Sequence, residues 1–207
     1  MNTVNTATDG SIGPRPAYEM LPILTGAARA DAAALAQNAS RCLAEQRINH
    51  PSGQLVDLIW SQANTLGLYE DGRLTALAVV PWGPDVRHWG AEGRGPGLLV
   101  SLVPPVPGQD SQAVRLLTLW LADRAARSGL EWVRWEIPAT ADVTSGTSTS
   151  LLMDALHNLG WEGLPPVRRA DGERVAPLRL RAERRKAPTV AISAPAAALR
   201  MLAVNGR

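Results

Sequence analysis

Apolar and polar residues along this chain recur with two periods, which together predict a mixed sheet with helices on its faces. Runs of Val, Ile, Leu and Trp between turn residues are typical of strands, and apolar residues three and four apart indicate helices. The predicted strands cover residues 18–24, 66–70, 74–80, 98–103, 130–138 and 175–181. The predicted helices cover residues 28–46, 52–64, 113–128 and 150–161.

Residues that favour helix caps and turns stand at the ends of these predicted segments. Thr25 and Ser52 stand where they can cap the first two helices, and Gly129 and Gly160 stand where helices end. Asp71-Gly72 is a strong hairpin signal between two apolar runs. We therefore expect antiparallel pairing across residues 66–103 and a right-handed parallel crossover from residues 98–103 to residues 130–138.

The stretch from residue 97 to residue 129 carries the first functional indication. An apolar strand ends in a loop rich in Pro and Gly, and the loop opens a long helix. The first turn of a helix presents N–H groups that have no partner within the helix, and the helix dipole favours negative charge there. This arrangement favours the binding of an anion, usually a phosphate.

The order of elements, with its sequence landmarks, resembles the GNAT-type N-acetyltransferase superfamily over residues 18–181. That family has a run V-x-P-x-x-[QR]-G-x-G-x-[GA] after the central strand, and Val103-Pro104-Pro105 matches its start. Gly108 stands where the family has Arg or Gln, and Gln109 and Ser111 stand where it has glycines. Ala113 fits the last position.

The resemblance extends to the second landmark of the family, usually L-G-F, which is matched by residues 159–161, Leu-Gly-Trp. It implies an α/β (α+β) fold, the GNAT-like acyl-CoA N-acyltransferase fold, with a mixed, mostly antiparallel twisted sheet flanked by helices. It also implies that loop N–H groups hold the pyrophosphate of acetyl-CoA. The residues so implied are Leu102, Val103, Gly108, Gln109, Ser111, Gln112 and Ala113. The alternative is that Asp110 or Ser111 caps the helix and that nothing binds.

The sequence does not identify a general acid at the position where the family has one. Leu156 stands where many family members have a tyrosine that protonates the departing thiolate, and His157 lies about 100° further round that helix. Neither tyrosine of the chain, Tyr18 or Tyr69, occupies that place. Protonation would then come from water or from a residue that the sequence does not identify.

In this fold the acceptor pocket is walled by the loop between the first two helices and by the loop over residues 81–96. Within these loops His88 and Glu92 are the candidate bases, and His50, Trp82 and Trp89 are candidate acceptor-binding residues. For each candidate base the alternative is an ordinary exposed loop residue. For the two tryptophans the alternative is that they anchor the loop to the core.

Composition narrows the remaining choices. The chain has 207 residues with a net charge of +2 and no basic stripe interleaved with aromatic residues, so we expect no nucleic-acid partner. A single cysteine, Cys42, excludes an internal disulfide, and three histidines without ligand spacing predict no metal site. No signal peptide or apolar run of membrane-spanning length is found, so we expect a cytoplasmic protein without membrane contact.

The predicted organisation is a disordered segment over residues 1–16, one GNAT-like domain over residues 17–183, and a tail over residues 184–207 in which residues 196–204 can form a short docking helix. An open sheet edge near the last strand would suit a homodimer. The predicted function is acyl-CoA-dependent N-acyl transfer, with acetyl-CoA as the donor, to an amine of a small molecule or peptide that attacks the thioester directly. A longer acyl chain seated against the tryptophans is one alternative. A GNAT-like binding or regulatory module without catalysis is another.

Overall fold

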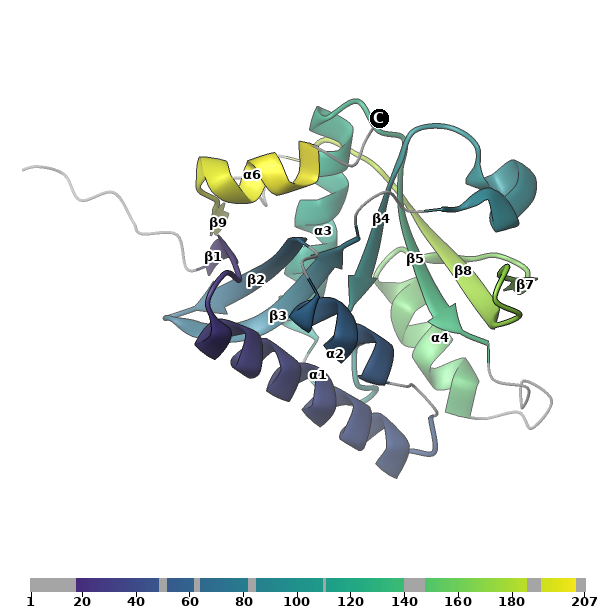
Figure 1. Ribbon diagram of the computed structural model, residues 1–207, viewed down its shortest axis with the longest axis horizontal. Coiled ribbons are helices and arrows are strands. Elements are labelled where there is room, and N and C mark those ends of the chain that lie inside the picture. The colour runs from purple at the N-terminus through teal and green to yellow at the C-terminus, as the bar shows by residue number, and fades with distance from the viewer. Residues whose placement is uncertain are drawn as a thin grey trace, which may run out of the picture.

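A computed structural model describes residues 18–48, 52–61, 64–81, 85–109, 111–139, 148–185 and 191–203 (Figure 1). The helices are α1 (Gly26–Glu45), α2 (Ser52–Trp60), α3 (Gln112–Arg127), α4 (Ser148–Asn158) and α6 (Ala196–Ala203), with a 3-10 segment η1 (Arg87–Gly93). The longer strands are β1 (Tyr18–Pro22), β2 (Asn64–Glu70), β3 (Arg73–Val80), β4 (Gly97–Leu102), β5 (Trp132–Pro138) and β8 (Arg174–Arg181). The two-residue strands are β6 (Glu162–Gly163), β7 (Val167–Arg168) and β9 (Ile192–Ser193).

One mixed sheet has the order β6-β8-β5-β4-β3-β2-β1-β9, with β7 also paired to β8. Pairing is antiparallel from β1 to β4, parallel between β4 and β5, and antiparallel again between β5 and β8. The predicted fold class and element order are therefore confirmed. β8 is flanked by β5 on one side and by β6 and β7 on the other, so the open edge expected near the last long strand is not present there.

Local sequence signals produce the predicted turns. Asp71 (φ 49°) and Gly72 (φ 78°) both adopt the left-handed conformation that a two-residue hairpin of this hand requires. The Thr25 hydroxyl accepts a hydrogen bond from the Ala28 amide (3.2 Å) and caps α1 as predicted. At the end of α3, Leu130 N donates to Ala125 O (2.9 Å) across Gly129, whose φ of 77° completes a Schellman motif.

Two predicted helices differ from the structure. The second helix ends at Trp60 and not at residue 64, because Asn64 already pairs with Val80 in the sheet. The spacing of the leucines predicts that Leu151, Leu152 and Leu156 share the apolar face of the fourth helix. In α4, Leu152 and Leu156 are buried, whereas Leu151 is 49% exposed and lies off that face.

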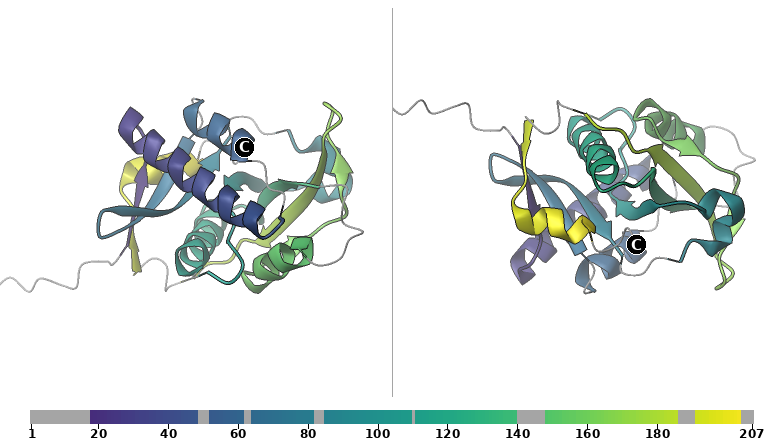
Figure 2. Two further views of the ribbon diagram at one scale, coloured as in Figure 1. Left: turned by 90° about the horizontal axis from the view of Figure 1, so that it is seen from below. Right: turned by 90° about the horizontal axis from the view of Figure 1, so that it is seen from above.

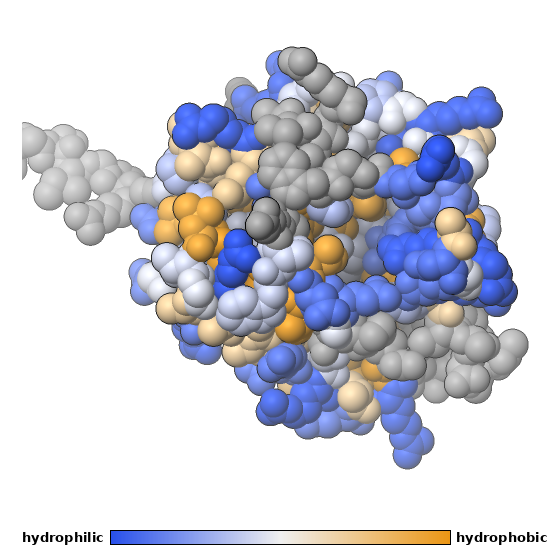
Figure 3. Space-filling view, in the orientation of Figure 1, coloured by the Kyte–Doolittle hydropathy of each residue, from blue (hydrophilic) through white to orange (hydrophobic). Residues whose placement is uncertain are grey.

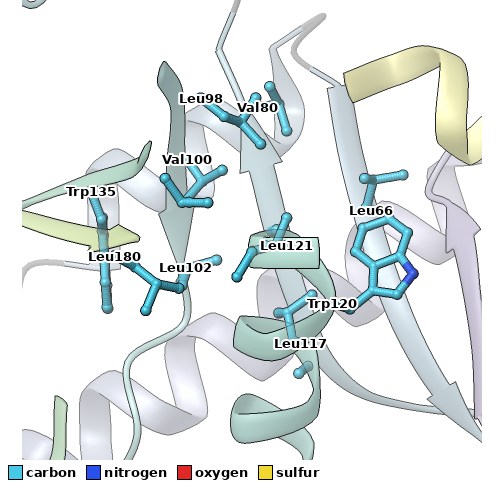
Figure 4. Packing of buried hydrophobic residues seen from close by; sticks show 14 of the residues in the cluster. Leu66, Val80, Leu98, Val100, Leu102, Leu117, Trp120, Leu121, Trp135 and Leu180 are labelled. Atoms are coloured by element: carbon cyan, nitrogen blue, oxygen red, sulfur yellow. The ribbon is translucent and has the colours of Figure 1, made fainter. Parts of the chain in front are cut away.

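Helices cover both faces of the sheet, with α1 and α2 on one face and α3 and α4 on the other (Figure 2). Successive side chains of β3 point to opposite faces of the sheet and so contribute to two hydrophobic cores. Leu77 and Val79 pack with α1 and α2, whereas Ala78 and Val80 pack with α3 on the second face. Figure 4 shows Trp120 and Leu121 of α3 lying against the central strands on that second face.

The C-terminal segment joins this architecture. β9 pairs in parallel with β1, and Ala198 and Leu202 of α6 are buried against the second core, so the expected short helix is present and packs on its own chain. The N-terminal segment expected to be disordered lies outside the described residues. Among the helices that the structure describes, none is both long and apolar enough to span a membrane.

Candidate functional site

The two parallel central strands separate at their carboxyl ends. β4 and β5 pair from Gly97 with Trp132 as far as Val100 with Trp135. Beyond that point, Ser101 and Leu102 pair only with β3, and Glu136 to Pro138 pair only with β8. The described sheet therefore has a notch between β4 and β5, with main-chain edges of both strands facing it.

An open cavity of about 700 Å³ lies at this notch. Its walls come from α2, from the ends of β4 and β5, from the segment leading into η1, and from the turn between β7 and β8. The apolar part of its lining is formed by Leu55, Leu58, Leu99, Leu102 and Trp135. A cavity of this size, mostly apolar with a few convergent polar groups, has the character of a small-molecule site.

Glu136 is the buried polar centre of the cavity wall. Its side chain is 4% exposed, and its Oε1 atom accepts hydrogen bonds from His88 Nε2 (2.6 Å) and Trp89 Nε1. Its Oε2 atom accepts from Arg169 Nε (2.8 Å) and from a second nitrogen of the same guanidinium. A carboxylate that accepts hydrogen bonds from this many donors is fixed in place.

Arg169 continues the network toward the rim. Burial alone would lower the pKa of Arg169, but its hydrogen bond to Glu136 and the nearby carboxylates raise the pKa above its usual value. Arg169 Nη1 also donates to Glu173 Oε2 (2.9 Å), and Gln54 Nε2 of α2 donates to Glu173 Oε1 (2.9 Å). A continuous chain of charged hydrogen bonds thus joins α2, across the rim, to η1.

Figure 3 shows this side of the molecule as mainly hydrophilic. Blue residues gather at the right, where β7 and β8 lie in Figure 1, whereas apolar residues appear nearer the middle of the face. The end of the molecule that carries the β7–β8 turn is therefore polar on this face.

His88 and Glu92, the two predicted bases, are separated by the structure. His88 lines the cavity, and its side chain is 14% exposed. Glu92 is exposed on η1, where its carboxylate pairs with Arg179 of β8, and it does not line the cavity. Trp89 is buried beside His88 and anchors η1 through Glu136, which was the alternative considered for it. His50 and Trp82 lie outside the described residues.

The predicted donor-binding loop follows the notch directly. Leu102 and Val103 are buried at the end of β4, Gly108 and Gln109 are exposed, and Gly108 has a φ of 80°. Ser111 occupies the N-cap position of α3 but makes no side-chain capping hydrogen bond. Ser111 therefore does not act as the cap that the alternative interpretation required, while Asp110 lies outside the described residues.

The first turn of α3 is held from two sides. Gln112 Nε2 donates to the Tyr18 hydroxyl (3.3 Å), and Ala113 packs partly buried against the core. Before the helix, Gln46 Nε2 from the end of α1 donates to Pro107 O (3.0 Å). The loop is thus fixed at both of its ends relative to the notch.

The side chains considered for the general acid, Leu156, His157 and Tyr18, do not line the described cavity. Leu156 is buried in the core, and His157 is exposed on the other side of α4. Tyr18 donates its hydroxyl hydrogen to Glu70 Oε1 (2.9 Å), on β1 and β2 rather than at the notch.

Sequence reasoning missed Glu136, Arg169 and the cavity-lining residues of α2. Glu136 lies in a strand whose other residues read as an ordinary alternating pattern, WVRWEIP. The available signal was a carboxylate within a central strand rich in Val, Ile and Trp, because such a residue is seldom buried without a partner.

No family model matches this sequence, and no curated protein matches it. Solved structures that resemble it include a GNAT-family acetyltransferase from Listeria monocytogenes 4b F2365, at 8% identity and TM-score 0.49, covering 78% of this chain and 95% of that chain. Another is yncA, a putative acetyltransferase from Salmonella typhimurium with its cofactor acetyl-CoA, at 17% identity and TM-score 0.43, covering 83% and 98%.

A third is ribosomal-protein-alanine N-acetyltransferase from Brucella melitensis, at 14% identity and TM-score 0.43, covering 77% of this chain and 97% of that chain. This chain itself has the element order and the parallel β4–β5 pair expected of the GNAT fold. What it does has to be inferred from its own cavity and side chains.

Proposed function

We propose that the protein is an acyl-CoA-dependent N-acyltransferase that uses acetyl-CoA and transfers its acyl group to the amine of a small molecule or peptide. The observation that carries this proposal is the His88–Glu136 pair on the wall of a cavity that opens at the β4–β5 notch. The notch adjoins the loop whose backbone the GNAT resemblance assigns to the donor pyrophosphate. Donor and acceptor can therefore meet between the two strands.

The donor fits the loop on two counts. The N-terminus of α3 lacks a side-chain cap from Ser111, and the positive φ of Gly108 turns the backbone before the helix. Gln109 and Ser111 in place of glycines restrict the approach of the phosphates.

These two residues favour the second candidate function, a GNAT-like binding or regulatory module without catalysis.

The His88 side chain supplies the base. Glu136 has only acceptor atoms, so a neutral imidazole beside it carries its proton on Nε2 and its lone pair on Nδ1. The lone pair takes a proton from the acceptor ammonium, and the freed amine attacks the thioester carbonyl carbon. The C–N bond forms and the C–S bond breaks. The nitrogen then gives up its second proton to water while the departing thiolate takes a proton from water, so that only the proton on His88 is released in the end. Holding the two reactants together supplies much of the acceleration.

Calorimetric titration with acetyl-CoA, followed by an acyl-transfer screen over amines, tests the proposal. Micromolar binding with turnover is expected, and His88→Ala should lower kcat about 100-fold or more while donor affinity stays unchanged. His157→Ala is the matched control, because that histidine is exposed on α4. Binding of acetyl-CoA without turnover of any amine would favour the binding module, and absence of binding would overturn the donor site.

A further inference from the structure

The η1 segment, which carries His88, is held at both ends by one face of β5. Near its start, Glu136 accepts hydrogen bonds from His88 and Trp89. At its end, Arg134 Nη2 donates to the carbonyl oxygens of residues 94 and 95, at 2.7 Å and 3.2 Å. Residues two apart on a strand share a face, so Arg134 and Glu136 act on η1 from the same side.

The Arg134 side chain is buried, and its surroundings fit it closely. It is 3% exposed, its guanidinium carbon lies 5.9 Å from the centre of the Trp89 ring, and burial lowers the pKa of Arg134. Gly97 of β4 leaves the space that the guanidinium occupies, because a Cβ atom there would lie 2.6 Å from Arg134 Nη1. Burying a cation against carbonyl groups costs free energy that an apolar side chain would not incur.

Trp89 connects the two contacts. Its indole N–H is bound by Glu136, and its ring lies beside the Arg134 guanidinium. His88 precedes Trp89 directly, so a shift of the backbone at Trp89 also shifts the backbone that carries the imidazole. The arrangement fixes the backbone of η1 on a strand that also forms one edge of the reaction site.

We propose that Arg134 is a positioning residue, which acts through η1 and Trp89 to hold the His88 imidazole at the cavity wall against Glu136. This inference rests on the proposed function for its catalytic consequence. The inference goes beyond the proposed function because it assigns a role to a side chain that touches neither reactant. Small displacements of a catalytic group are costly in rate, which makes such a clamp effective.

Arg134→Met removes the hydrogen bonds and the charge at similar volume. Its matched control is Arg124→Met on α3, where a guanidinium carbon lies 5.8 Å from the Trp120 ring and far along the chain from η1. Gly97→Ala is a second variant, which displaces the Arg134 guanidinium without removing it. It keeps the proposal testable should Arg134→Met fail to fold.

Two readouts separate positioning from general stability. Arg134→Met and Gly97→Ala should lower kcat about 10- to 100-fold with KM for the amine within about twofold, and Arg124→Met should change neither. Nitrogen-15 NMR of the histidine rings should show His88 as the Nε2–H tautomer in the wild type and an averaged tautomer in Arg134→Met and Gly97→Ala. The chain has only three histidines, so the assignment is direct.

The two readouts fail independently. Loss of turnover in all proteins, wild type included, would refute the proposed function while the NMR comparison still decides the role of Arg134. An unchanged His88 tautomer together with unchanged kcat in the folded Arg134→Met and Gly97→Ala proteins would overturn the positioning role.

Discussion

At the scale of single residues, Glu136 organises the polar side chains at the cavity wall. It is buried in a central strand and accepts hydrogen bonds from His88, Trp89 and Arg169. Each donor comes from a segment distant in sequence, so one carboxylate joins η1 and the β7–β8 turn to β5. Loss of the negative charge on Glu136 would weaken its hydrogen bonds to the donors of all three residues at once.

Glu136→Gln keeps the size of the side chain and removes its charge. We expect the free energy of unfolding to fall by about 3 kcal/mol, because the change breaks a buried ion pair with Arg169. Glu162→Gln is the matched control: Glu162 is exposed and pairs with Arg179, so the loss should stay below about 1 kcal/mol. Urea denaturation of the two variants measures both values, and equal losses would show that Glu136 is no more than a surface partner.

At the scale of elements, the ends of α3 and α4 are defined by glycines in the left-handed conformation. Gly129 has a φ of 77° and Gly160 a φ of 91°, and each is followed by a residue whose amide donates back to the last turn. Leu130 and Trp161 then enter the core. The same motif thus ends each helix and starts the chain back toward the sheet.

Gly129→Ala tests how much this backbone conformation contributes. A Cβ atom at Gly129 would meet nothing within 4 Å, so the substitution adds strain from φ alone. The expected loss in the free energy of unfolding is about 1 kcal/mol. Gly26→Ala, where a Cβ also meets nothing and φ is not positive, should be neutral or slightly stabilising. Similar denaturation midpoints for the two variants would contradict this account of the cap.

Elements governed by local chemistry could be predicted from the sequence, and contacts between distant segments could not. The Thr25 cap, the Asp71-Gly72 turn and the glycine caps depend on neighbouring residues alone. The partner of Glu92 is Arg179, 87 residues away, and the donors to Glu136 come from 33 to 48 residues away. His88 was found because it lies in a long loop, whereas Glu136 and Arg169 required the folded register.

At the scale of the whole molecule, Asp123 of α3 joins the helix to the chain that leaves β8. Its side chain is 1% exposed, Oδ2 accepts from Arg127 Nε (2.7 Å), and Oδ1 accepts from the Arg185 amide (2.8 Å). Residues 191–203 then return to the opposite edge of the sheet, where β9 pairs with β1. The Asp123 contact therefore fixes the start of the segment that leads to that edge.

Acid stability should depend on this carboxylate. Burial alone would raise the pKa of Asp123, but the hydrogen bonds from Arg127 and Arg185 outweigh it, and the pKa lies below 3.8. Because the pKa is lower in the folded state, the stabilisation is present above about pH 4 and is lost as the pH falls through the folded-state pKa.

Asp123→Asn should therefore lower the free energy of unfolding by about 1.5–3 kcal/mol at pH 7. Between about pH 5 and about pH 2 its free energy of unfolding should decline less than that of the wild type. Urea denaturation across that pH range measures the slope. Asp154→Asn, at an exposed position of α4, should keep the wild-type decline. A wild-type decline in Asp123→Asn would mean that other carboxylates govern acid unfolding.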